Sequence, residues 1–472
     1  MGVKVLLLVL SRNFIYCSYL IQPMSDPYEQ RDHLVSEAPS SLWRQLKYLG
    51  PGFILSASIV GSGELIATTT LGARAGFVTF WIILMSCLIK VCVQLEFGRY
   101  TIIHARTPME AFNGLPGKKL GKAHWSIWTF FVLMVFKILQ VGGVLGGVAI
   151  ILHMLAPALP MGVCAFFIAV IVALMIFKGY YTFIEKFSLS MIVLFTLFTF
   201  VCLYFLKYTD YSVTLDDVFS GLQFALPKEA VGVAIAAFGI TGVGGDEIIA
   251  YNYWCLEKGY AAKAGAYDNS RESIDRIKGW TRVMYVDAVT AMIVYTTVTA
   301  AFYLLGAAVL HAAGTVPEGY EMVNILATMY TESLGPGARV FFMVGAFMVL
   351  FSTLFAALAA WTRQFSDIFG QLGWMNFRDE NDRKKSIAYL SWTFPFLWAA
   401  MFLFIKLPVL MILIGGVVTS LILLLVIWVV VHFRYRRTPP VFHPSMTYDL
   451  ILWLSIVSTV LIATYGIVKL LF

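Results

Sequence analysis

Apolar residues in this chain gather into long runs that polar residues interrupt only briefly. A sliding window of about 19 residues finds eleven apolar segments. They lie near residues 49–70, 77–96, 128–154, 162–177, 188–206, 229–251, 282–309, 338–361, 387–405, 408–432 and 448–471. Such runs can cross a bilayer, where a helix satisfies its own backbone polar groups. The pattern therefore predicts an all-α integral membrane protein with about eleven transmembrane helices.

The parts of the chain outside these segments are short. No long polar domain separates the segments, so we expect residues 49–472 to form a single transmembrane domain and residues 1–48 an N-terminal cytoplasmic tail. The first 23 residues contain a short apolar run, but Arg12 and Asn13 interrupt it and no small-residue cleavage site follows. Met24 opens a polar stretch typical of a tail. Residues 1–23 are therefore either not part of the physiological protein or a weak interfacial anchor.

The composition agrees with a membrane protein and narrows its class. Hydrophobic residues make up 60% of the chain and charged residues 13%, with a mean hydropathy of +0.80. A soluble domain carries about 25% charged residues. The formal charge of +7 is explained by basic cytoplasmic loops, so no nucleic-acid partner is expected. The six cysteines lie in or beside apolar runs without zinc-type spacing. No nucleophile–base set is present either, so neither an enzyme nor a cofactor is predicted.

The charges of the loops predict an orientation in the membrane. The loops near residues 97–124, 178–187, 255–280, 362–386 and 433–446 together carry twenty Lys and Arg residues. The opposite loops and the C-terminus carry five: Arg74, Lys207, Lys228, Lys406 and Lys469. Because basic residues collect in cytoplasmic loops, the N-terminus is predicted to be cytoplasmic and the C-terminus external. The plasma (inner) membrane is the expected location.

Two octapeptides in this sequence echo each other. Val60-Gly61-Ser62-Gly63-Glu64-Leu65-Ile66-Ala67 lies in the first segment, and Val243-Gly244-Gly245-Asp246-Glu247-Ile248-Ile249-Ala250 lies in the sixth. Both run small, small, acidic, aliphatic, aliphatic, alanine, and Glu64 corresponds to Glu247. Because they are five spans apart, they enter the membrane from opposite sides. This is typical of an inverted five-plus-five repeat, of the leucine-transporter type, followed by one extra helix.

The two octapeptides also supply the candidate binding residues. Clustered glycines in mid-span weaken a helix, and freed backbone groups are tolerated there only where they line a cavity or bind something. A carboxylate beside such a break is itself a sign of function. We therefore predict discontinuous helices 1 and 6 around a substrate site formed by Gly61, Ser62, Gly63, Glu64, Val243, Gly244, Gly245, Asp246 and Glu247. The alternative is that the glycines serve close helix packing.

Other polar residues inside the apolar segments are candidates of lower rank. Lys137 and Gln140 lie three apart on one helical face of the third segment. Lys137 is too central to snorkel easily, so we expect an acidic partner among Glu64, Asp246 and Glu247, and a coupling or charge-balancing role for Lys137 and Gln140. The remaining pairs have plainer interpretations. Lys90 and Glu96 are expected to snorkel to the cytoplasmic edge, and Asp287 to pair with Arg282.

Several motifs spread over most of the chain resemble one family. They are Gly50-Pro51-Gly52, Gln94-Leu95-Glu96-Phe97-Gly98-Arg99, Thr107-Pro108-Met109-Glu110 and the link from Gly179 to Lys186. These motifs, with eleven spans, resemble the Nramp (natural resistance-associated macrophage protein) family of proton-coupled divalent-metal transporters. The resemblance implies the inverted-repeat fold and a substrate site between the first and sixth helices.

The functional residues of that family, however, are mostly replaced. Where its first helix carries Asp-Pro-Gly-Asn, this chain has Gly61-Ser62-Gly63-Glu64. Its Met-Pro-His motif of the sixth helix corresponds, within one residue of register, to the stretch from Val243 to Asp246, which holds no Met or His. Lys137 and Gln140 stand where the family has an Asp-x-x-Glu pair linked to proton movement. The resemblance thus implies the scaffold, with the metal site and the proton path rewritten.

Two hypotheses for the cargo follow. In the first, the chain is an Nramp-like secondary transporter, ion- or proton-coupled, that moves a metal cation. Glu64, Asp246 and Glu247 would form an oxygen-only cage, which suits hard ions such as Mg²⁺ or Mn²⁺. In the second, the same fold carries a small organic solute such as an amino acid or amine, whose carboxylate binds N–H groups at a half-helix start. Whole-chain similarity favours the metal cation. Lys137 argues against it, because a buried cation weakens the binding of a nearby dication. A receptor or structural membrane protein is a third, weaker hypothesis.

Overall fold

The computed structural model describes residues 26–29, 32–177 and 181–471. The helices that carry the predicted apolar segments are α3 Pro51–Ile59, α4 Thr69–Ala75, α5 Phe80–His104, α7 Trp125–Leu155, α8 Met161–Phe177, α9 Tyr181–Phe205, α11 Val231–Ile240, α12 Gly245–Glu257, α14 Arg271–Leu305, α16 Ala338–Leu372, α17 Glu380–Ile405, α18 Pro408–His432 and α19 Met446–Leu471. A π-helical segment, η3 (Val60–Thr68), joins α3 to α4. Each predicted apolar segment lies largely on these helices, so the all-α prediction is confirmed.

Shorter elements connect the long helices. The short α-helices are α2 Leu42–Gln45, α6 Pro108–Asn113, α10 Leu215–Ser220, α13 Tyr260–Ala264 and α15 Met322–Leu334. A small antiparallel hairpin pairs β1 (Lys119–Leu120) with β2 (Ala123–His124). Further π-helical segments are Gly306–His311 and Phe433–Arg437. Turns of 3₁₀ helix are Asp32–Leu34, Leu46–Tyr48, Gly76–Thr79, Leu206–Tyr208, Lys228–Ala230, Gly319–Glu321 and Pro440–Phe442.

The number of spans agrees with the sequence pattern. Among the described residues, eight helical stretches are long and apolar enough to cross a membrane. One of them, Pro51–His104, contains two predicted segments that meet at the turn Gly76–Thr79. Two shorter apolar helices, Met161–Phe177 and Val193–Tyr208, account for two more. Each of the eleven predicted segments is therefore accounted for by helix, with a break inside the sixth.

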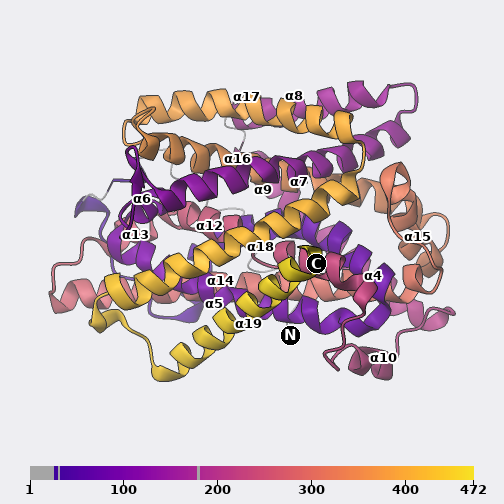
Figure 1. Ribbon diagram of the computed structural model, residues 1–472, viewed down its shortest axis with the longest axis horizontal. Helices are drawn as coiled ribbons and strands as arrows, with labels where there is room; N and C mark the ends of the chain where they lie inside the picture. Colours follow the sequence, from indigo (N-terminus) through magenta and orange to yellow (C-terminus); the bar gives the residue numbers. More distant parts are fainter. Residues whose placement is uncertain (1–25, 30–31, 178–180, 472) are drawn as a thin grey trace.

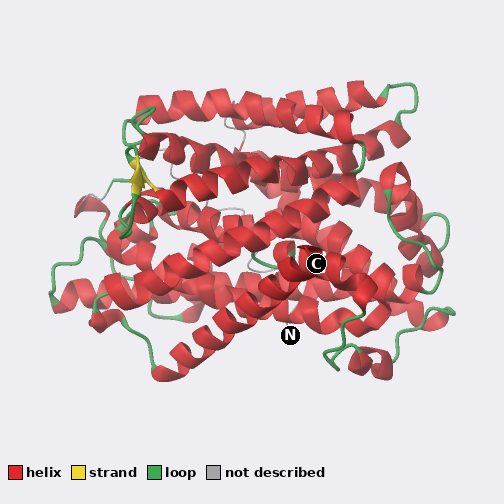
Figure 2. Ribbon diagram, in the orientation of Figure 1, coloured by secondary structure: helices red, strands yellow, loops and turns green. Residues whose placement is uncertain are grey.

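The long helices lie side by side in one bundle (Figure 1). The central helices α5, α7, α11, α14 and α18 make the most extensive contacts, α18 with α7 and α5 with α14. α17 packs against α8 along the upper edge of the view, and α19 crosses its lower part. The connecting elements gather at two ends: α6, α13 and the β-hairpin at one, α10 and α15 at the other (Figures 1 and 2).

The sixth span is broken where its glycines predict. α11 ends at Ile240 and α12 begins at Gly245, with residues 241–244 outside any helix. Gly242 has a φ of +65°, a conformation that glycine adopts without steric penalty. This non-helical stretch separates the two half-helices α11 and α12.

The first span differs from the prediction of an open break. Its backbone stays helical from α3 to α4, because η3 widens the helix into π turns instead of unwinding it. Its glycines allow other helices of the protein to pack closely against it. A Cβ on Gly61 would lie 1.9 Å from Thr353 Oγ1, and one on Gly63 would lie 2.9 Å from the carbonyl oxygen of Ile240. For this span, the close-packing alternative accounts for both glycines.

Candidate functional site

A small cavity lies where α3, α7, α12 and α16 meet. It is lined by Ile54, Leu55 and Ser58 of α3, Lys137, Gln140, Val141 and Val144 of α7, Asp246, Glu247, Ala250 and Trp254 of α12, and Thr353, Ala356, Ala357, Ala360, Trp361 and Gln364 of α16. Its free volume of about 40 Å³ for water-sized spheres holds one ion or a few water molecules in this conformation. Polar side chains from all four helices thus converge in an otherwise apolar wall.

The start of α12 places two carboxylates at this cavity. Gly244 is the N-cap, and its backbone N–H donates to Glu247 Oε2 at 2.7 Å, as in a capping box. Asp246 and Glu247 both lie in the first turn, where the helix dipole favours negative charge. The preceding glycines let α12 approach α18. A Cβ on Gly245 would lie 2.5 Å from the backbone nitrogen of Leu423.

Lys137 and Asp246 form a buried ion pair across the cavity. The Lys137 ammonium donates to Asp246 Oδ1, and the two side chains are 4% and 7% exposed. This confirms the expectation that Lys137 pairs with one of the three acids. Gln364 Nε2 donates to the backbone carbonyl of Asp246 at 2.9 Å and ties α16 to the same turn. The ion pair and this hydrogen bond together link α7, α12 and α16.

Three further polar groups face the cavity beside this pair. Glu247 Oε1 lies 3.5 Å from the Ser58 hydroxyl, so α3 and α12 meet through it. Gln140 accepts a hydrogen bond from Thr419 of α18 at 3.4 Å. Gln364 Oε1 is buried and has no hydrogen-bond partner among the described residues. The cavity therefore offers acceptor oxygens that the protein itself only partly occupies.

Glu64, the third carboxylate of the predicted cage, has partners of its own, and the cage stays a prediction. Glu64 is not among the residues that line the cavity. Glu64 Oε1 accepts from the backbone N–H of Gly242 at 3.2 Å, and Oε2 lies 3.3 Å from the Thr68 hydroxyl. In the part of the chain that the structure describes, no group of three or more His, Cys, Asp or Glu side chains could hold a metal ion. The helical turn that carries Glu64 points it toward the break in the sixth span.

The other predicted site residues shape the backbone. Val243 is fully buried in the break between α11 and α12. A Cβ on Gly244 would lie 2.7 Å from Thr419 Cγ2, so this glycine is needed for the approach of α18. Ser62 lies in the π-helical segment η3. Val243 and Gly244 are not among the residues that line the cavity.

Sequence reasoning missed the role of Lys90. Instead of snorkelling, this side chain is fully buried and donates to the carbonyls of Phe238 (2.8 Å) and Thr241 (2.7 Å) at the end of α11. The last carbonyls of a helix have no partner within it and attract a buried donor. The available signal was the position of Lys90 inside an apolar segment, several residues before its end.

Two other expectations for buried charges were also wrong. Glu96 does not reach the membrane edge but is buried with Arg99, at 2.5 Å. Asp287 does not pair with Arg282. It accepts from the backbone N–H groups of Gly50 (2.9 Å) and Gly52 (2.6 Å) and so caps the start of α3. In both cases a nearer partner on a neighbouring turn or helix satisfies the charge.

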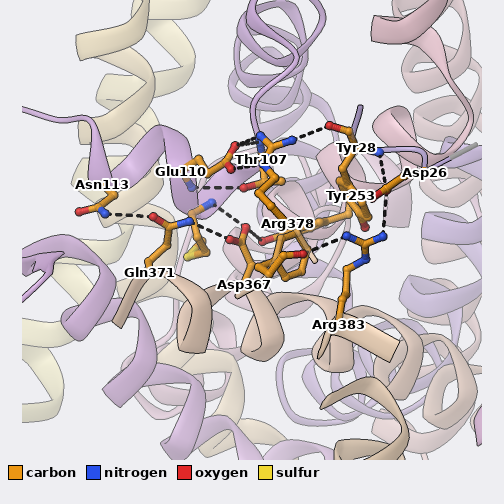
Figure 3. A network of polar contacts seen from close by, with 12 residues as sticks. Asp26, Tyr28, Thr107, Glu110, Asn113, Tyr253, Asp367, Gln371, Arg378 and Arg383 are labelled. Carbon is orange, nitrogen blue, oxygen red and sulfur yellow. Dashed lines mark hydrogen bonds and ion pairs between the residues drawn. The ribbon is translucent and has the colours of Figure 1, made fainter. Parts of the chain in front are cut away.

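A second polar network closes one end of the bundle (Figure 3). Its core is Arg378, whose guanidinium binds both oxygens of Glu110 (2.6 and 2.5 Å) and the backbone carbonyl of Tyr28 (2.5 Å). Arg383 pairs with Asp26 at 2.9 Å. These contacts tie the described N-terminal residues to α6 and to the start of α17.

The same network reaches the half-helix α12. The Tyr253 hydroxyl donates to Asp367 of α16 at 2.7 Å, and the Tyr28 hydroxyl donates to Glu257 at 2.7 Å. Burial, and then the neighbouring Glu257 carboxylate, raise the pKa of Tyr28 well above its usual value, so its hydroxyl remains a donor. The base of α12 is therefore held by both α16 and the N-terminal stretch.

Comparison with known proteins identifies the scaffold. The family model described as natural resistance-associated macrophage protein-like (Nramp) matches residues 52–469. The chain belongs to the Nramp family. An uncharacterized protein of Pasteurella multocida is 24% identical to this Nramp-family chain over 349 residues, which cover 70% of this chain and 72% of the relative.

Solved structures share the fold of this Nramp-family protein. The manganese transporter of Eremococcus coleocola is 15% identical, with 92% of this chain and 97% of that chain covered and a TM-score of 0.53. A nucleobase-cation-symport-1 family transporter is 14% identical, with 92% and 95% covered and a TM-score of 0.56. A Na⁺-coupled sialic acid symporter is 13% identical, with 99% and 97% covered and a TM-score of 0.50. The protein is thus an all-α, multi-pass membrane transporter.

Proposed function

We propose that this Nramp-family protein carries a hard divalent cation, Mg²⁺ or Mn²⁺, through the cavity between α3, α7, α12 and α16, coupled to another ion or to protons. The observation that carries the proposal is the donor set. The side-chain acceptors that line the cavity are oxygens: two carboxylates, two amides and the hydroxyls of Ser58 and Thr353. Oxygen ligands select hard cations. The likeness to the manganese transporter of Eremococcus coleocola supports the same class of cargo.

Two carboxylates are enough for such an ion. Mg²⁺ keeps several of its waters and is held by one or two carboxylates. Asp246 and Glu247 supply these, and the free Gln364 Oε1 offers a further acceptor. The small volume of the cavity agrees with an ion and a few waters. The proposal therefore needs Asp246 and Glu247, and Glu64 acts outside the cargo site.

Lys137 fits this proposal as a competitor for the cargo. Its ammonium forms an ion pair with Asp246 in this structure. An arriving dication displaces the ammonium from that carboxylate, because two positive charges repel each other in a low-dielectric site. Gln140, one turn from Lys137 and in the same wall, supplies an amide to either the ion or the displaced ammonium. The lysine thus lowers the affinity of the cavity for the cation, because the cation must displace it from Asp246.

We also propose that the N-terminus is cytoplasmic, the C-terminus external and the protein located in the plasma (inner) membrane. The segregation of basic loops supports this orientation. The basic loops around α6 and α13 lie at one end of the bundle, and the loops around α10 and α15 lie at the other (Figure 1). The end of the bundle that contains α6 and α13 is therefore the one that we propose to face the cytoplasm.

An organic solute, an amino acid or amine, is the second candidate. The observation that favours it is the ion pair, because Lys137 and Asp246 offer one charge of each sign to a zwitterion. Trp254 and Trp361 add aromatic surface to the same cavity. Neighbours on this fold whose names specify a nucleobase–cation or sialic acid symporter show that the fold accepts organic cargo.

The test is binding and uptake with two matched variants. We expect the purified protein to bind Mn²⁺ or Mg²⁺ in calorimetry and to take up Mn²⁺ in proteoliposomes. Glu247→Gln should lower the initial rate about tenfold or more, since a hydrogen bond or contact to a charged group contributes about 1.5–3 kcal/mol. Glu64→Gln removes a charge of the same kind outside the cavity and should retain most of the uptake.

Two different results would contradict two different parts of this proposal. Calorimetric binding of an amino acid or amine, with none of Mn²⁺ or Mg²⁺, would replace the metal proposal by the organic one. Equal loss of uptake in Glu64→Gln and Glu247→Gln would restore the symmetric site predicted from the repeat. Size-exclusion profiles of both variants show whether a loss of uptake reflects unfolding.

A further inference from the structure

The end of α11 forms a second polar site, separate from the cargo cavity. Three backbone carbonyls, of Phe238, Gly239 and Thr241, surround the Lys90 ammonium at 2.8, 3.4 and 2.7 Å. The Lys90 side chain has no solvent exposure, and its ammonium lies 5.1 Å from the centre of the Phe238 ring. None of these four residues lines the cargo cavity.

The geometry of this site is that of a cation site. The carbonyls at a helix C-terminus have no partner in the helix and form the negative end of its dipole. The hydroxyl of Ser86, one turn before Lys90 on α5, lies within hydrogen-bond distance of the carbonyls of Phe238 (2.9 Å) and Thr241 (2.7 Å) and donates its one hydrogen between them. The aromatic face of Phe238 adds a further attraction for a positive charge.

One peptide group in the break is held at both of its poles. The carbonyl of Thr241 accepts from Lys90, and the N–H of the same peptide, on Gly242, donates to Glu64 at 3.2 Å. A buried ammonium and a buried carboxylate therefore bracket a peptide in the break of the sixth span. This arrangement explains why a lysine and a glutamate remain in the apolar interior, where an unpaired charge is strongly unfavourable.

We propose that the carbonyls of Phe238, Gly239 and Thr241 form a monovalent-cation site and that the Lys90 ammonium is its tethered occupant. The free ligands of the same class are ammonium, Na⁺ and K⁺. In transporters with broken helices, carbonyls at half-helix C-termini coordinate dissolved Na⁺ or protons. Here the charge is covalently attached, so the broken helix is neutralised without any dissolved monovalent ion at this position.

Lys90→Ala tests the proposal by emptying the site. The variant is purified in detergent with EDTA, and its melting temperature is measured in choline, ammonium, sodium and potassium chloride at equal ionic strength. We expect the melting temperature to fall in choline, which is too large for the site. Ammonium or an alkali ion should raise it again, saturably and by roughly 3–6 °C. The wild type should respond equally to all four salts.

Two further variants complete the experiment. Lys90→Met fills the volume without a charge and should not respond to any of the small ions. Lys90→Ser leaves the volume open and keeps one donor, and it takes the place of Lys90→Ala if the alanine variant does not fold. If the open variant melts at the same temperature in all four salts, the carbonyls are not a cation site and the proposal is overturned. The readout uses no cargo, so its outcome is independent of the proposed metal transport.

Discussion

At the scale of single residues, this protein satisfies the buried charges described above with specific partners. Arg99 forms an ion pair with Glu96, Lys137 forms one with Asp246, and Lys90 donates hydrogen bonds to backbone carbonyls. A charge without a partner is strongly unfavourable in an apolar interior, whereas a paired one is tolerated. Each polar residue in a span therefore points to a second group that the sequence alone does not identify.

The pair of Lys137 and Asp246 gives the first prediction. Lys137→Met leaves the Asp246 carboxylate buried and unpaired and should lower the free energy of unfolding by about 3–5 kcal/mol. Asp246→Asn should do the same for the ammonium. The double variant removes both charges and should recover most of the loss. Thermal unfolding of the detergent-solubilised proteins provides the comparison. Losses that simply add in the double variant would show that the two side chains do not interact.

At the scale of elements, glycines decide how closely the half-helices approach their neighbours. Gly61 faces Thr353 of α16, and Gly245 faces the backbone of α18. Gly232, in contrast, lies in α11 with nothing within 4 Å of an added Cβ. The chain thus contains glycines that packing requires and at least one that it does not.

These two kinds of glycine give the second prediction. In Gly61→Ala the new methyl group would lie 1.9 Å from Thr353 Oγ1, so η3 and α16 must separate. Overpacking of this kind should destabilise the protein by about 1–3 kcal/mol. Gly232→Ala should be neutral, or stabilising by up to about 1 kcal/mol, because alanine favours a helix. Melting temperatures of the two variants provide the measurement. Similar values for both would mean that η3 and α16 do not meet as described.

At the scale of the whole molecule, the connecting elements gather at two opposite ends of the bundle (Figure 1). Lys119 lies in the hairpin at one end, and Glu321 lies beside α15 at the other. Both residues are exposed. If the bundle crosses the membrane as proposed, these two positions face opposite compartments.

Cysteine labelling gives the third prediction. Lys119→Cys should react with an impermeant maleimide only after the cells are permeabilised, and Glu321→Cys should react in intact cells. Cys17 is replaced by serine in the parent protein, and the described cysteines, Cys87, Cys92, Cys164, Cys202 and Cys255, are all buried, so little background is expected. Labelling of both positions from outside would mean that the number of spans between them, or the orientation, is wrong.

The order of apolar and polar residues was sufficient for much of this architecture. The positions of the spans, the break in the sixth span and an acidic partner for Lys137 all followed from the sequence, since length, glycine clusters and buried charge act locally. The family resemblance, carried by short motifs, was confirmed as well. Apart from the partner of Lys137, which the sequence narrowed only to three acids, these features depend on residues that are neighbours along the chain.

The arrangement of the site required the packed structure. Glu64 and Glu247 occupy matching places in the repeat, yet Glu64 holds the N–H of Gly242 while Glu247 faces the cavity. Lys90 lies on α5, and its partners lie about 150 residues later at the end of α11. Periodicity tells which side chains share one face of a helix but not which helix covers that face. The partners of buried polar groups are therefore decided by contacts between distant segments.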